Sequence, residues 1–131
     1  MKRTAILIDN NDHKSILIMV DIAHAKEIFP YIFSDNIDFE FKAIRYLLKN
    51  NLRNPEKYQK VKVSSKAENM FEMRFIKYSR NDRIYCQEIS KGGKRFIIMI
   101  ELFQGKKSQE IPKKIKSRIE TMGGYDYELQ F

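Results

Sequence analysis

The chain has 131 residues, of which 43% are hydrophobic, and it carries a formal net charge of +8. This length and apolar content suit one folded domain with a single core, and they exclude a chain that is disordered throughout. The single cysteine, Cys86, excludes an intrachain disulfide, and no apolar run has the length of a membrane span. We therefore expect one domain over residues 1–131, located in the cytoplasm and with no membrane partner.

The first 35 residues are expected to include a β-hairpin. Two short apolar runs, residues 5–8 and 16–20, are separated by the turn-forming sequence DNNDHKS. Residues 22–33 are ambiguous, because their apolar spacing is helical but Pro30 would interrupt a helix interior. Either one helix ends before Pro30 or a short one begins there.

A helix is predicted over residues 38–52, where apolar side chains recur at helical spacing. These apolar residues are Phe41, Ile44, Leu48 and Leu52. The candidate N-caps are Ser34, Asp35 and Asp38. The dipeptide Asn54-Pro55 should stop the helix, and residues 56–70 then form either a second short helix or a loop.

Residues 71–103 are predicted to form three strands in an antiparallel meander. The runs FEMRFIKY, RIYCQEI and RFIIMIELF are separated by short turns, and they alternate between apolar and polar residues or are apolar throughout. The alternation puts Arg74 and Arg83 on neighbouring strands, each on the less apolar face. Cys86 falls on an apolar face, which predicts a buried structural thiol rather than a nucleophile.

A basic helix is predicted after the meander, with Pro112 in its first turn and Gly123-Gly124 at its end. Its apolar face consists of Ile111, Ile115, Ile119 and Met122. From Lys91 to Arg118 the chain has nine Lys and Arg residues and two acids, which is +7 of the total +8. A last short strand is expected in the alternating tail. The predicted fold class is therefore α+β: a small antiparallel or mixed sheet, N-terminal helices packed on one face, and a basic C-terminal helix.

The residue types favour phosphate binding over metal or cofactor chemistry. The two histidines, His13 and His24, have no partner at metal-ligand spacing, and no phosphate-binding glycine loop occurs. We expect no cofactor and no metal. Arginines and lysines close to a sheet can bind a phosphodiester or stabilise a pentacovalent transition state. The positive charge alone does not distinguish a phosphate-binding surface from an ordinary solvated surface. An ordinary solvated surface is the more common outcome.

The order of segments resembles the RelE/ParE toxin superfamily of toxin–antitoxin modules, in its HigB-like branch. The segments that carry the resemblance are FEMRF, DRIYCQ, RFIIMIELF and FQGKKSQEIPKKIKSRI. The resemblance implies a toxin that cleaves messenger RNA, often on the ribosome, and that a cognate antitoxin neutralises. A ParE-like minority of the family inhibits gyrase instead. Residues 1–35 match no part of the family pattern and are expected to be an atypical N-terminal extension.

The resemblance also implies roles for individual residues. The catalytic candidates are Arg83, Arg74 and Lys107. The candidates for binding RNA phosphates are Lys106, Lys113, Lys114, Lys94 and Arg95. The auxiliary candidates are Tyr85, Tyr125 and Tyr127. In some family members a tyrosine near the C-terminal helix helps to activate the 2′-hydroxyl of the RNA, but Ile111 and Pro112 occupy that region here.

Three functions remain open at this stage. The first is a growth-inhibiting mRNA endoribonuclease that works by metal-independent attack of the RNA 2′-hydroxyl. The second is a non-catalytic protein of the same fold, either a gyrase inhibitor or a degenerate scaffold. The third is a general nucleic-acid-binding domain. It is the weakest, because neither a second recognition helix nor a set of exposed sheet aromatics is evident.

Overall fold

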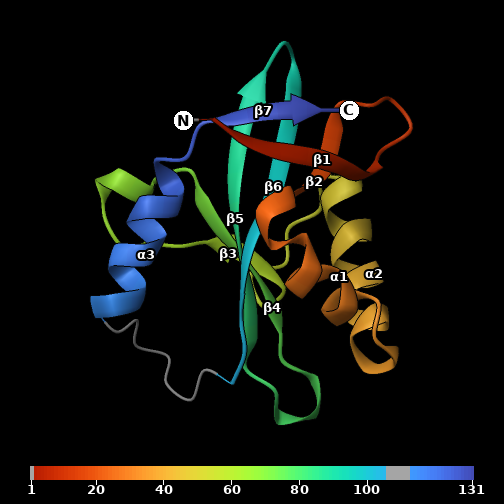
Figure 1. Ribbon diagram of the computed structural model, residues 1–131. Coiled ribbons are helices and arrows are strands. Elements are labelled where there is room, and N and C mark those ends of the chain that lie inside the picture. Colours follow the sequence, from red (N-terminus) through yellow and green to blue (C-terminus); the bar gives the residue numbers. More distant parts are fainter. Residues whose placement is uncertain (1, 106–112) are drawn as a thin grey trace.

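The computed structural model describes residues 2–105 and 113–131, and within them seven strands form one sheet in the order β3-β4-β5-β6-β2-β1-β7 (Figure 1). The strands are β1 Arg3–Asn10, β2 Ile16–Asp21, β3 Tyr58–Lys60, β4 Met70–Phe75, β5 Asp82–Lys91, β6 Lys94–Phe103 and β7 Tyr127–Gln130. The α+β class is confirmed. The sheet is larger than the small one expected, because the N-terminal hairpin and the C-terminal strand extend the meander.

Strand pairing confirms the meander, the hairpin and the last strand. β4, β5 and β6 pair antiparallel in succession, and β1 and β2 form the antiparallel N-terminal hairpin. β2 also pairs parallel with β6, and β7 pairs parallel with β1. Because β2 lies between β6 and β1 and all of its residues are buried, the hairpin is part of the sheet rather than an added extension.

The helices cover both faces of the sheet (Figure 1). Their bounds are α1 Ala25–Ile32, α2 Asp35–Lys49 and α3 Lys113–Gly123. One core cluster joins α1 and α2 to the sheet through side chains such as Ile28 and Phe41. A second cluster lies on the opposite face and includes Ile119 and Met122 of α3. Each face of the sheet is therefore buried by a different set of helices.

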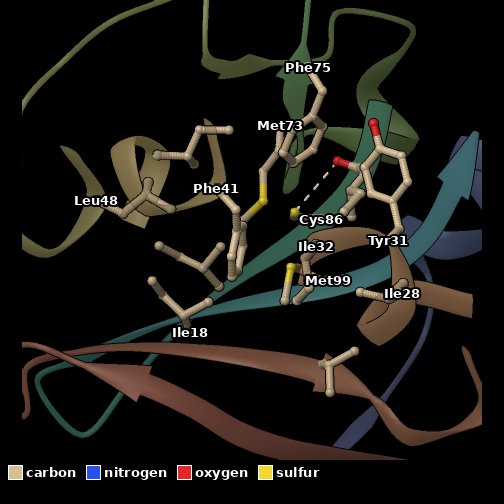
Figure 2. Close-up of a cluster of buried hydrophobic side chains, with 14 of the residues drawn as sticks. Ile18, Ile28, Tyr31, Ile32, Phe41, Leu48, Met73, Phe75, Cys86 and Met99 are labelled. Atoms are coloured by element: carbon tan, nitrogen blue, oxygen red, sulfur yellow. Dashed lines mark hydrogen bonds between the residues drawn. The ribbon is translucent and has the colours of Figure 1, made fainter. Parts of the chain in front are cut away.

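Cys86 lies inside the core cluster of α1 and α2 (Figure 2). It is fully buried, and its Sγ donates to the Ile84 carbonyl oxygen over 3.6 Å. Burial raises the pKa of the thiol well above its usual value. These observations confirm the predicted structural thiol and leave no exposed thiolate for nucleophilic chemistry.

Three local predictions need correction. Helix α1 runs through Pro30 instead of ending or beginning there, because burial of Ile28, Tyr31 and Ile32 offsets the hydrogen bond that proline cannot make. Helix α2 begins after Ser34, which is one of the three N-cap candidates, so it starts three residues before the predicted range and ends at Lys49. The segment 56–70 holds the strand β3 and the short helical turn η2, Ser65–Ala67. β3 is only three residues long, so its alternation is too brief to detect.

Buried carboxylates fix the two ends of the β4–β5 connection. Glu40 of α2 accepts hydrogen bonds from the backbone N–H groups of Ile76 and Lys77, at 3.1 and 3.3 Å. Asp82 at the start of β5 accepts from the Tyr31 hydroxyl at 2.6 Å and from the Gly105 backbone N–H at 2.8 Å. The strand ends that carry Arg74 and Arg83 are thus attached to α1, α2 and the end of β6.

Among the residues described, no helix is both long enough and apolar enough to cross a membrane.

Candidate functional site

Four polar side chains share one face of β4 and β5. In the antiparallel register Arg74 lies opposite Arg83, and Glu72 lies opposite Tyr85. Tyr85 belongs to the core cluster that α3 covers, whereas Ile84 belongs to the cluster under α1 and α2. Because side chains alternate along a strand, all four face the α3 side of the sheet. The predicted placement of the two arginines on adjacent strands is confirmed.

Glu72 is the centre of this group. Arg83 Nη1 donates to Glu72 Oε1, Gln59 Nε2 donates to the same oxygen at 3.1 Å, and Arg74 Nε lies 3.8 Å from it. Glu72 is 2% exposed and Arg83 is 5% exposed, so their ion pair is buried. One carboxylate therefore balances Arg83, and the charge of the more exposed Arg74 remains in excess.

Each arginine has a side-chain donor without a hydrogen-bond partner among the described residues. Arg74 Nε and Arg83 Nε are buried, and neither has a hydrogen-bond partner in the described part of the chain. Leaving a charged donor unpaired in the protein costs about 1–3 kcal/mol or more. Arg45 Nε and Arg80 Nε likewise lack hydrogen-bond partners among the residues described, but the Arg74 and Arg83 donors lie on residues in direct cross-strand register. The two guanidinium groups together place more positive charge on this face than Glu72 neutralises.

Tyr85 adds a neutral hydroxyl to the same face. Its side chain is fully buried, its ring meets Phe103 edge-on at 5.2 Å, and its hydroxyl has no partner among the described residues. Burial and the nearby Glu72 carboxylate raise the pKa of Tyr85 to about 12, while Arg83 acts in the opposite direction. The hydroxyl stays protonated at neutral pH, and this suits it to donate a hydrogen bond rather than to accept a proton.

These four side chains therefore form a cluster with a net positive charge, and several of its polar atoms lack hydrogen-bond partners among the described residues. No family model, curated protein or solved structure matches the chain. The role of this face is therefore inferred from the chemistry of its side chains alone. Within the described residues, no group of three His, Cys, Asp or Glu side chains is arranged to hold a metal ion.

Two predicted phosphate ligands lie at the other end of the sheet. Lys94 and Arg95 follow the β5–β6 turn, and Arg95 pairs with Ser90 in the β5–β6 register. Ser90 lies seven positions along β5 from Arg83, which is roughly 23 Å of extended strand. Arg95 is also engaged by Glu88, through Nε at 2.9 Å and Nη2 at 2.8 Å. These two residues do not join the arginine pair.

The C-terminal tyrosines also lie elsewhere. The Arg3 guanidinium is 4.1 Å from the Tyr125 ring centroid, and the Tyr127 hydroxyl donates to Asp21 at 2.6 Å. Asp21 is buried and also pairs with Arg3, so the three strands β1, β2 and β7 are joined there. Tyr127 therefore has a structural partner far from Arg83 in the sheet order.

The remaining basic candidates are on or before α3. Lys113 is the first residue of the helix, and Lys114 is exposed on it. Lys106 and Lys107 lie outside the described residues, as do Ile111 and Pro112.

Sequence reasoning missed Glu72 and Gln59 as members of the cluster. Glu72 could have been found, because the alternation that selects Arg74 also puts Glu72 on the same face. Gln59 had no such signal, since β3 is short and its position beside β4 follows from the fold.

Proposed function

We propose that this protein is a RelE/ParE-type toxin that cleaves messenger RNA without a metal ion. The observation that carries the proposal is the cross-strand pair Arg74 and Arg83, two guanidinium groups that face a single carboxylate, Glu72. RNA contributes its own nucleophile, the 2′-hydroxyl, so the protein has to supply only charge stabilisation and proton transfer. The protein would act in the cytoplasm on translated mRNA, and a cognate antitoxin would neutralise it.

The order of elements supports this proposal. Helix α2 precedes the meander β4–β6, and helix α3 follows it. This is the order that the resemblance implies for the family fold. The strands β1, β3 and β7 enlarge the sheet at its two edges.

In the proposed reaction, the RNA 2′-oxygen attacks the adjacent phosphorus and the bond to the 5′-oxygen of the next nucleotide breaks. Arg74 and Arg83 stabilise the additional negative charge on the phosphorane. Solvent water accepts the 2′-hydroxyl proton, since Glu72 is 2% exposed and already accepts hydrogen bonds from Arg83 and Gln59. The leaving 5′-oxygen takes up a proton from water, and the products are a 2′,3′-cyclic phosphate and a 5′-hydroxyl.

A specific observation favours a second candidate, a non-catalytic protein that inhibits gyrase or binds a partner. Arg83 is almost fully buried and already paired with Glu72, so its charge is not freely available. A DNA supercoiling assay with purified gyrase separates the two functions. Inhibition of supercoiling without RNA cleavage would establish the second.

Induction of the protein in growing bacteria is expected to arrest growth and to fragment transcripts. The Arg74→Gln variant should lose at least about tenfold of this activity, since a charged hydrogen bond contributes about 1.5–3 kcal/mol. Arg74 is a suitable test residue because its side chain is 21% exposed, so its replacement should leave the fold intact. Lys26→Gln, at an exposed lysine of α1, is the charge-matched control. Normal growth with intact transcripts would contradict the proposal.

A further inference from the structure

A cavity of about 340 Å³ lies between the C-terminal end of α2 and the edge strand β3. Its size is within the range of small-molecule sites, near the lower limit. It opens on the sheet face covered by α1 and α2, because Tyr58 packs against that core cluster. The Arg74–Arg83 pair faces the opposite side, so this cavity is a separate feature.

The lining of the cavity is strongly cationic. It includes four basic residues and no Asp or Glu: Arg53, Lys60, Lys62 and Arg95. The first three are exposed, and none of them forms an ion pair within the described part of the chain. Unpaired cations around one concave site attract an anion, and arginine and lysine together are typical phosphate ligands.

One wall of the cavity is flat and aromatic. The rings of Tyr58 and Phe71 stack with centroids 5.4 Å apart and an interplanar angle of 5°. Glu88 holds this wall in place, since it accepts hydrogen bonds from both the Tyr58 hydroxyl and Arg95. Leu47 and Leu52 add apolar lining. A planar ring can extend such a stack, which stabilises nucleobases regardless of their identity.

We propose that this cavity binds a nucleoside phosphate, with the base on the aromatic wall and the phosphate among the cations. The amide side chains of Asn51 and Asn54 line the same space and can hydrogen-bond the edges of a base. The cavity has room for one ligand of nucleotide size. An acidic helix of a partner protein, the other kind of anionic ligand, would need an elongated groove. The ligand is either a free nucleotide or one nucleotide within an RNA strand.

The test is a titration of the isotope-labelled protein, followed by backbone amide NMR. The ligands are inorganic phosphate, adenosine monophosphate, a four-nucleotide single-stranded RNA and poly-glutamate. Adenosine monophosphate should bind at least about tenfold more tightly than phosphate, because stacking of one base contributes at least that factor. The largest shifts are expected near Tyr58 and Phe71. Tighter binding of the RNA than of the mononucleotide would identify an RNA strand as the source, and equal binding would identify a free nucleotide.

The double variant Arg53→Gln/Lys62→Gln should weaken nucleotide binding by about tenfold or more. The control Lys26→Gln/Lys116→Gln removes the same charge from exposed positions on α1 and α3, and it should change affinity less than about twofold. The proposal is overturned if adenosine monophosphate and inorganic phosphate bind with the same affinity, or if both double variants lose the same affinity for adenosine monophosphate. Binding of poly-glutamate alone would also overturn it. The NMR shifts locate this binding at Tyr58 and Phe71 without any cleavage readout, so a failure of the RNA cleavage proposal is distinguishable from a failure here.

Discussion

Replacing Arg83 with alanine should lower the free energy of unfolding by about 3–5 kcal/mol and abolish RNA cleavage. The loss of stability arises because Glu72, which is 2% exposed, would keep a buried charge without its closest partner. The loss of cleavage arises because the remaining Arg74 would face the phosphorane alone. Chemical denaturation and transcript mapping measure the two effects separately.

A double variant separates the structural and chemical roles of Arg83. Glu72→Leu/Arg83→Met removes both buried charges and fills their volume with apolar atoms, so most of the lost stability should return. Cleavage should remain absent, because the Arg83 cation is missing. A stable double variant that still fragments transcripts would show that the pair serves the fold alone.

Replacing Phe41 with alanine should lower the free energy of unfolding by about 3–5 kcal/mol. Its ring is fully buried in the core cluster where α2 packs on the sheet (Figure 2), and truncation would leave a cavity there. Phe39 offers a matched control, since it lies two residues earlier on the same helix and is 69% exposed. Phe39→Ala should cost less than about 1 kcal/mol, although it also removes a cation–π contact with Lys77. Equal losses in denaturant titrations would contradict the assigned helix orientation.

The features predictable from the sequence are those set by local periodicity and short connections. Apolar and polar residues alternate clearly in the strands around Cys86. Turns of only a few residues between these strands favour antiparallel pairing of neighbours, which gives a meander. Alternation and short turns together are also sufficient to predict that Arg74 lies beside Arg83. The apolar spacing of Ile115, Ile119 and Met122 likewise predicts the face of α3 that lies on the sheet.

The features that sequence reasoning missed depend on contacts between distant segments. The position of β2 between β6 and β1 follows from a parallel pairing across about 80 residues, which no local pattern encodes. The burial of Arg83 depends on Glu72 and on Gln59 of β3, a strand too short to be detected. The sequence pattern also did not reveal that Glu72 pairs with both arginines and reduces the net positive charge there.

The chemistry of the new RNA ends is the most direct test of the central claim. After induction of the wild-type protein, attack by the 2′-hydroxyl predicts upstream fragments with a 2′,3′-cyclic phosphate or a 3′-phosphate. The downstream fragments should then begin with a 5′-hydroxyl, and all of these ends should disappear in the Glu72→Leu/Arg83→Met variant. Fragments with a 3′-hydroxyl and a 5′-phosphate, or ends that persist in this variant, would contradict cleavage at the Arg74–Arg83 face.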